Sequence, residues 1–260
     1  MGLTSGSTGR KAVDEGLVIH RESPQDRVVA LAGNPNVGKS TVFNGLTGMN
    51  QHTGNWPGKT VANAQGRCEH NGRGFVMVDI PGSYSLMAHS AEEEVARDFI
   101  CFGDPDAVVV VCDATCLERN LNLVLQTIEI TPRTVVCVNL MDEAKKKKIH
   151  VDIGALSKQL GVPVTGAAAR SGRGLDELMD AVDAVTHDKA TQADPVQILY
   201  APAIEQAVAL LEPPLRECCG EKISSRWLAL RLLEGEEELI RSAQQYLGGP
   251  VLKTPAVQEP

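Results

Sequence analysis

The chain has 260 residues and a formal net charge of −8, and no apolar run approaches the roughly 20 residues that a membrane-spanning helix needs. The sequence therefore excludes a transmembrane segment, and its negative charge argues against nucleic acid as a main partner, because binding phosphates requires a basic surface. Seven cysteines are scattered without a Cys-x-x-Cys pair, which argues against a structural zinc site. The N-terminus has no signal-peptide pattern, so we expect an intracellular protein.

Composition divides the sequence into four parts. Residues 1–26 are rich in Gly, Ser, Thr and charge and are expected to form a flexible extension. Over residues 27–188 strand patterns alternate with helix patterns, which predicts a doubly wound α/β domain with a mostly parallel sheet and one antiparallel edge. Residues 195–250 lose the strand pattern and show helical apolar spacing, which predicts a small all-helical appendage, and residues 251–260 follow as a tail.

Apolar runs and turn residues predict the individual elements. Continuous apolar runs, typical of strands covered on both faces, lie at residues 28–32, 75–78, 107–112 and 135–138. The pair Asn71-Gly72 predicts a hairpin turn between strands at 65–70 and 74–80. Residues 50–59 are expected to form a polar loop. Helical spacing lies at residues 41–46, 121–130, 156–160 and 175–185, and in the appendage at 204–211, 223–233 and 236–247.

The most informative segment follows the first predicted strand. It reads Gly33-Asn34-Pro35-Asn36-Val37-Gly38-Lys39-Ser40-Thr41 and fits the pattern G-x-x-x-x-G-K-[ST] between a strand and a helix. In such a loop, glycines allow successive backbone N–H groups to face phosphate oxygens near a helix N-terminus. Lys39 would then reach the β- and γ-phosphates, and the Ser40 hydroxyl would bind Mg²⁺. The alternative, a chance glycine-rich turn, does not explain the strand before it.

Further segments indicate a guanine nucleotide. Asp79 ends a predicted strand and begins Asp-Ile-Pro-Gly, so its carboxylate would hold Mg²⁺ through water while Gly82 contacts a γ-phosphate. Thr60, which follows Gly58 in the polar loop, would close over Mg²⁺ and the γ-phosphate. Asp142, after another predicted strand, would accept two hydrogen bonds from guanine. Adenine lacks that pair of donors and would leave a buried carboxylate unpaired. Together these segments predict binding of GTP and GDP.

The base-specific segment reads Asn139-Leu140-Met141-Asp142, with leucine where most GTPases have a lysine. With this departure, and with segments 33–44, 55–61, 79–86, 93–98 and 226–235, the chain resembles the cytoplasmic part of the bacterial ferrous-iron transporter B (FeoB) family over about residues 28–247. The resemblance implies a P-loop GTPase domain and a GDP-dissociation-inhibitor-like helical domain at the cytoplasmic face of the inner membrane. It also implies a membrane domain in the same polypeptide that carries Fe²⁺, regulated or powered by GTP.

The resemblance also implies that backbone N–H groups of Ala167, Ala168 and Ala169 contact the guanine oxygen. The predicted nucleotide site comprises Gly33, Asn34, Pro35, Asn36, Val37, Gly38, Lys39, Ser40, Thr41, Gly58, Thr60, Asp79, Gly82, Asn139, Leu140, Asp142, Ala167, Ala168 and Ala169. The predicted metal ligands are Ser40, Thr60 and Asp79 for Mg²⁺ and Asn36 for K⁺. Catalysis is assigned to Lys39, Thr60, Gly82 and Asn36.

Hydrolysis is expected to be slow. Switch GTPases often place a glutamine after Asp-x-x-Gly to orient the attacking water, whereas this chain has Ser83. No arginine is identifiable as a finger acting in cis. Asn36 occupies the position that binds K⁺ between the phosphates in related cation-activated GTPases, where the ion replaces the charge of that arginine. The alternative is that Asn36 only stabilises a turn.

Other functions stay open at this point. A ribosome-associated or RNA-modifying GTPase would need a basic module, and a non-hydrolytic adaptor would use GTP only to order its switches. We expect no nucleic-acid partner, and weak self-association is a further expectation. The run Lys145 to Lys148 is typical of a solvated helix end. The glutamates at residues 92–94, near His89, are typical of a helix N-terminus rather than a metal site.

Overall fold

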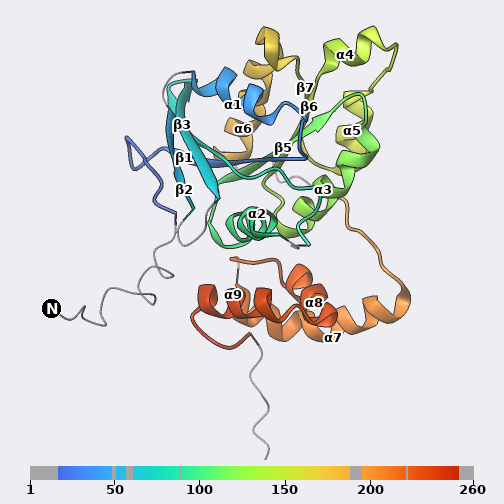
Figure 1. Cartoon of the computed structure of the whole chain (residues 1–260). Helices are drawn as coiled ribbons and strands as arrows, with labels where there is room; N and C mark the ends of the chain where they lie inside the picture. The colour runs from blue at the N-terminus through green and yellow to red at the C-terminus, as the bar shows by residue number, and fades with distance from the viewer. Residues whose placement is uncertain are drawn as a thin grey trace, which may run out of the picture.

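The computed structural model describes residues 17–48, 51–56, 61–87, 90–187, 195–220 and 222–251. Over these ranges the chain forms a seven-stranded sheet with helices on both faces, and three further helices pack beneath it (Figure 1). Of the predicted flanks, residues 1–16 and 252–260 lie outside the described part. No helix of the described part is long and apolar enough to cross a membrane.

The sheet has the strand order β2-β3-β4-β1-β5-β6-β7. Its strands are β1 (Arg27–Gly33), β2 (Gln51–Asn55), β3 (Ala62–His70), β4 (Arg73–Asp79), β5 (Ala107–Asp113), β6 (Thr134–Asn139) and β7 (Val164–Gly166). β1 pairs in parallel with β4 and β5, and parallel pairing continues through β6 to β7. β3 pairs antiparallel with β2 and β4, so the predicted fold class is confirmed.

The antiparallel edge contains one confirmed prediction and one wrong one. Asn71 and Gly72 have φ values of 51° and 74°, as a two-residue turn between β3 and β4 requires. The polar loop expected at residues 50–59 is wrong over residues 51–55, because β2 pairs with β3 there. Most of β2 is exposed and polar, so no apolar alternation marks this strand in the sequence.

Helices cover both faces of the sheet (Figure 1). They are α1 (Lys39–Thr47), α2 (Ala91–Phe102), α3 (Leu117–Ile130), α4 (Met141–Lys146), α5 (Ile153–Leu160) and α6 (Leu175–His187), with a 3₁₀ turn at Ala169–Ser171. In β1, Val28 and Ala30 pack into the layer of α2 and α3, whereas Val29 and Leu31 pack toward α1 and α6. Both faces of the strand are buried, which explains its continuous apolar run.

The predicted helical appendage consists of α7 (Pro202–Cys219), α8 (Ser225–Glu234) and α9 (Glu237–Leu247). The helix expected at residues 204–211 is longer than predicted, because α7 continues through Pro213 and Pro214. A proline inside a helix removes one backbone hydrogen bond. Burial of Val208, Leu215 and Cys219 on one side of α7, packed against α8, keeps the helix continuous.

The appendage packs on α2 and α3 (Figure 1). The Tyr200 hydroxyl donates to the Glu129 carboxylate at the end of α3, 2.8 Å away. Burial and the Glu129 charge raise the pKa of Tyr200 to about 12, so the phenol keeps its donor proton at neutral pH. Arg97 of α2 is buried, with Nη1 4.0 Å from a carboxylate oxygen of Glu236. α2 follows the Asp-Ile-Pro-Gly segment closely, so the appendage touches an element next to that motif.

Candidate functional site

The loop between β1 and α1 depends on a glycine for its shape. Gly38 lies directly before α1 with φ 82°, and a Cβ there would be 2.5 Å from Asn139 Nδ2. Asn36 also has a positive φ, 68°, a conformation that asparagine tolerates better than most residues. Ser40 and Thr41 are exposed in the first turn of α1. The segment therefore has the strand–loop–helix geometry that phosphate binding uses.

The segment after β4 lies against this loop. A Cβ on Gly82 would be 3.4 Å from the backbone nitrogen of Pro35, so the two backbones approach closely. The Ser83 N–H donates to the Gly33 carbonyl at 3.1 Å. Two motifs that are far apart in the sequence thus form one continuous surface.

Lys39 and Asp79 bring opposite charges together at the centre of this surface. The Lys39 ammonium forms an ion pair with Asp79 and donates to the Ile80 carbonyl at 2.6 Å. Both charged side chains are mostly buried, 11% and 17% exposed. A phosphate that draws Lys39 toward itself competes with this pair, and the carboxylate then becomes available to a cation. The Ser40 hydroxyl and the Asp79 carboxylate are hard oxygen donors, so the residues present fit Mg²⁺.

Asn139 joins the phosphate loop to the segments predicted to hold the base. It ends β6 and is 1% exposed. Its Nδ2 donates to the Val37 carbonyl, and its Oδ1 accepts from the Ala169 N–H, both at 3.1 Å. Both ends of the amide are therefore satisfied by backbone groups, and Asn139 acts as an internal strut.

The alanines at residues 167–169 lie beside Asn139, and their N–H groups already have acceptors. These acceptors are, in chain order, the Val138 carbonyl at 2.8 Å, the Arg173 carbonyl at 2.9 Å and Asn139 Oδ1 at 3.1 Å. The first two alanines line a cavity together with Asp142. A guanine oxygen that takes one of these donors therefore competes with an existing bond.

Two cavities lie at the two ends of the predicted nucleotide site. One, of about 620 Å³, is lined by the phosphate loop, Gly82 and Tyr84. The other, of about 740 Å³, is lined by Asp142, Lys145 and Arg173 among others. Leu140 has φ 61° directly before α4, and Asp142 lies in the first turn of that helix. The lysines at residues 145–148 are exposed at the end of α4, as predicted.

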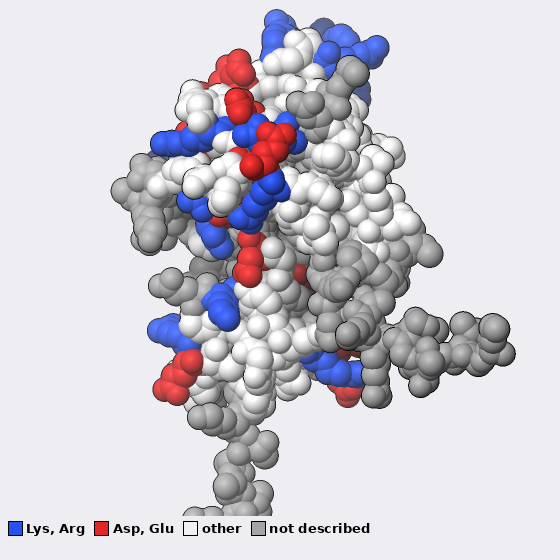
Figure 2. All heavy atoms as spheres, turned by 90° about the vertical axis from the view of Figure 1, so that its left-hand side faces the viewer, with Lys and Arg blue, Asp and Glu red and all other residues white. Residues whose placement is uncertain are grey.

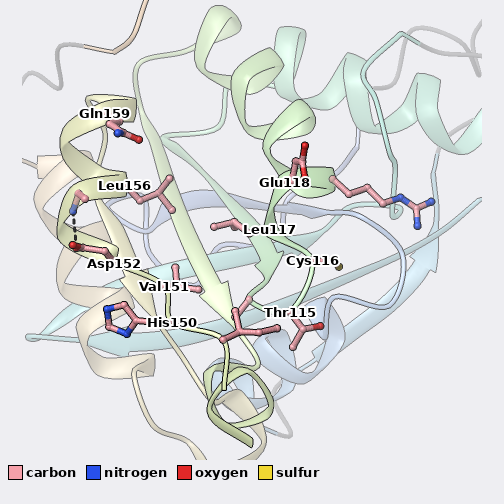
Figure 3. Close-up of a pocket in the computed structure, with 13 residues that line it drawn as sticks. Thr115, Cys116, Leu117, Glu118, His150, Val151, Asp152, Leu156 and Gln159 are labelled. Carbon is pink, nitrogen blue, oxygen red and sulfur yellow. Dashed lines mark hydrogen bonds between the residues drawn. The ribbon is translucent and has the colours of Figure 1, made fainter. Parts of the chain in front are cut away.

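A third cavity, of about 600 Å³, lies between the start of α3 and α5. Figure 3 shows Leu117 and Leu156 facing each other across it, with His150 near its edge. Asp152 caps α5 by accepting from the Ala155 N–H at 2.9 Å. In the described part of the chain its lining includes none of the predicted nucleotide-site residues, so we assign it no role in nucleotide binding.

Gly58 and Thr60 lie outside the described residues. At the two ends of that gap, the Trp56 N–H donates to the Val61 carbonyl at 2.7 Å. Trp56 is 7% exposed, and its ring meets Phe99 of α2 edge-on with the centroids 5.2 Å apart. Trp56, at one end of the gap, is therefore anchored on α2.

Comparison with known families identifies the group to which this site belongs. A model described as ferrous iron transport protein B matches residues 27–182, which contain all of the predicted nucleotide-site residues. The chain belongs to the ferrous iron transport protein B (FeoB) family. A second model, the FeoB cytosolic helical domain, matches residues 200–256 and so includes α7 to α9.

Curated relatives carry the same family name. The Fe(2+) transporter FeoB of Salmonella typhimurium is 37% identical over 214 residues, which are 80% of this chain and 27% of that protein. The Fe(2+) transporter FeoB of Escherichia coli is 37% identical over 218 residues, with the same coverage of 80% and 27%. The chain therefore spans about a quarter of the length of the curated relatives it matches.

Solved FeoB structures share the fold. The cytosolic domain of the T. maritima FeoB iron transporter in GDP form I is 35% identical, with a TM-score of 0.77 and coverage of 88% of each chain. Its GMPPNP form is 34% identical, with a TM-score of 0.74 and coverage of 88% of each chain. The cytosolic domain of L. pneumophila FeoB is 31% identical, with a TM-score of 0.72 and coverage of 85% of this chain and 94% of that one. These likenesses confirm the predicted resemblance.

In this FeoB chain, the Ser83 side chain is turned into its own loop. It is 3% exposed, and its hydroxyl bonds to the Ser85 carbonyl and accepts from the Ser85 N–H within a tight turn. Tyr84, the next residue, is exposed, and the Arg119 guanidinium lies 4.3 Å from the centroid of its ring. No local pattern links Arg119 to Tyr84. The one available signal is the helical spacing of Arg119, Asn122 and Gln126.

Charges of both signs are mixed on the face that carries the antiparallel edge (Figure 2). Arg67 of β3, for example, pairs with Asp26, Glu22 and Glu69 at 3.0, 3.2 and 2.9 Å. Burial raises the pKa of Cys137 to about 12, as expected of a small core residue rather than a nucleophile. His89 lies outside the described residues, and the glutamates at 92–94 fall in the first turn of α2, as predicted.

Proposed function

We propose that this chain binds guanine nucleotides and hydrolyses GTP slowly, with Mg²⁺ held by Ser40 and Asp79. One observation carries the proposal: the phosphate loop, the Asp-Ile-Pro-Gly segment and the Asn-Leu-Met-Asp segment meet at one edge of the sheet through direct contacts. The solved GDP and GMPPNP forms of the T. maritima relative support the same class of ligand.

Each residue then has a physical role. Lys39, released from Asp79, neutralises charge on the β- and γ-phosphates, while the Gly82 N–H faces the terminal phosphate. Asp142 accepts the two donors on the edge of guanine, and Thr60 closes over Mg²⁺ and the terminal phosphate. Bound Mg²⁺ supplies further neutralisation of the charge that develops during phosphoryl transfer.

The proposed biological role follows from the family. Relatives are named Fe(2+) transporters, so we infer that this domain lies at the cytoplasmic face of the membrane and regulates or powers transport by a membrane domain of the same polypeptide. The contact between Arg97 of α2 and Glu236 of the appendage supports this role, because it couples an element beside the nucleotide site to α7–α9.

The decisive experiment is turnover by the purified chain in matched KCl and NaCl buffers, with GTP as substrate and ATP as control. Hydrolysis of GTP alone is the expected result, and equal hydrolysis of ATP would contradict the assigned role of Asp142. Turnover that rises in K⁺ would support cation assistance through Asn36. No turnover of GTP in either salt would contradict the hydrolytic function and leave a nucleotide-dependent adaptor.

Two matched variants decide the role of Asn36. Asn36→Ala should remove any K⁺ stimulation if its side chain holds the ion. Asn71→Ala is the control, because Asn71 also has a positive φ, 51°, but lies in the hairpin turn away from the phosphate loop. An unchanged K⁺ response in Asn36→Ala would assign that side chain to the turn alone.

A further inference from the structure

Tyr84 is the first side chain after Gly82 that reaches the surface of the phosphate cavity. It is 42% exposed and lines this cavity together with Asn34, Pro35 and Gly82. The intervening Ser83 is buried in its own turn. Any group that fixes Tyr84 therefore also restrains the backbone that carries the Gly82 N–H.

Arg119, in the first turn of α3, contacts Tyr84 directly. Its guanidinium lies 4.3 Å from the centroid of the tyrosine ring, which is a cation–π geometry. Its carbonyl accepts a long hydrogen bond from Asn34 Nδ2 at 3.5 Å. Arg119 thus touches both the phosphate loop and the Asp-Ile-Pro-Gly segment.

The same side of α3 continues this contact. Asn122 Nδ2 donates to the Tyr84 carbonyl at 3.4 Å. Gln126 accepts from the Leu86 N–H at 2.7 Å and donates to Ser85 Oγ at 3.1 Å. Positions 119, 122 and 126 share one side of a helix, so α3 presents a polar edge to the whole segment 84–86.

Among the described residues, the guanidinium of Arg119 lies against the Tyr84 ring. The side chain is exposed and lies in the first turn of a helix, where the helix dipole disfavours a cation. The Tyr84 ring offsets this unfavourable position of the cation, because the negative face of an aromatic ring attracts a guanidinium.

We propose that Arg119 is a positioning residue for the terminal phosphate, which acts by stacking on Tyr84 and holding residues 82–86 against the phosphate loop. This inference rests on the proposed nucleotide-binding function. GDP lacks the phosphate that Gly82 faces, so the stacked pair strengthens binding of a triphosphate and leaves binding of a diphosphate unchanged.

The test is the affinity of the whole chain for GMPPNP and for GDP, each measured by calorimetry with Mg²⁺. Arg119→Ala and Tyr84→Ala should each weaken GMPPNP binding by about two- to fivefold, the fold-change that an exposed cation–π contact corresponds to. GDP binding should be unchanged in both. Tyr84→Phe keeps the ring and should behave as wild type, as should Arg241→Ala, which removes an exposed charge on α9.

The double variant separates positioning from direct action. If Arg119 acts through Tyr84, the variant that combines Arg119→Ala and Tyr84→Ala loses no more GMPPNP affinity than the weaker-binding of the two single variants. Losses that multiply, or equal losses of GDP and GMPPNP affinity, would overturn the proposal. A wild-type chain that binds neither nucleotide would refute the proposed function and this inference together. Normal wild-type binding with an unchanged GMPPNP-to-GDP preference in the variants would refute the inference alone.

Discussion

Replacing Asn139 by alanine tests whether this side chain is an internal strut or a contact to the base. The substitution removes two buried hydrogen bonds of 3.1 Å and leaves the Val37 carbonyl and the Ala169 N–H without partners. An unpaired buried backbone group costs about 1–3 kcal/mol, so two such groups cost about 2–6 kcal/mol. We therefore expect Asn139→Ala to destabilise the α/β domain as well as weaken GDP binding.

Thermal unfolding without nucleotide measures the first effect. For a chain of this size, a loss of about 2 kcal/mol in unfolding free energy corresponds to a fall in Tm of at least about 4 °C. Asn120→Ala is the matched control, because Asn120 is also 1% exposed but donates only within its own region, to the Cys116 carbonyl at 2.8 Å. The control should lose about 1 kcal/mol of unfolding free energy and keep wild-type affinity for GDP.

One outcome would refute this structural role of Asn139. If Asn139→Ala unfolds at the wild-type temperature while its GDP affinity falls sharply, the side chain acts on the nucleotide and not on the loops. Titration calorimetry with GDP, run on the same preparation, gives the affinity needed for this comparison.

Other predictions follow from single contacts. Gly38→Ala should abolish GDP binding, because its Cβ would meet a neighbouring amide at 2.5 Å; Gly72→Ala, with a similar φ of 74° and open space around it, should bind normally. Trp56→Ala should destabilise the domain by about 3–5 kcal/mol in urea unfolding, and a loss below about 1 kcal/mol would contradict the packing of this ring. Arg226 lowers the pKa of Glu205 from 4.5 to about 2, so their ion pair stabilises the folded chain above pH 4.5 and loses this effect as the pH falls toward 2. The difference in Tm between wild type and Glu205→Gln should shrink over that range, and a constant difference would refute the assignment.

Much of the fold could be predicted because its signals are local. The apolar run of β1 and the Asn71-Gly72 turn each specify backbone structure within a few residues. The meeting of the motifs was also predictable, since the carboxyl ends of parallel strands lie at one edge of a sheet. Asp79 ends β4 and Asn139 ends β6, and both lie beside the phosphate loop as this rule requires.

The sequence by itself determined the fold class, the family and the residue types at the phosphate loop, because these depend on composition, spacing and short motifs. The tertiary structure decided which partners those residues have. The Asn139 amide bonds to groups 102 and 30 residues away, and Arg119 stacks on a tyrosine from another motif. β2 likewise pairs with the edge of β3, although most of its residues are polar and exposed. A residue type fixes what a side chain can donate or accept, whereas the partner depends on which distant backbone groups are buried beside it.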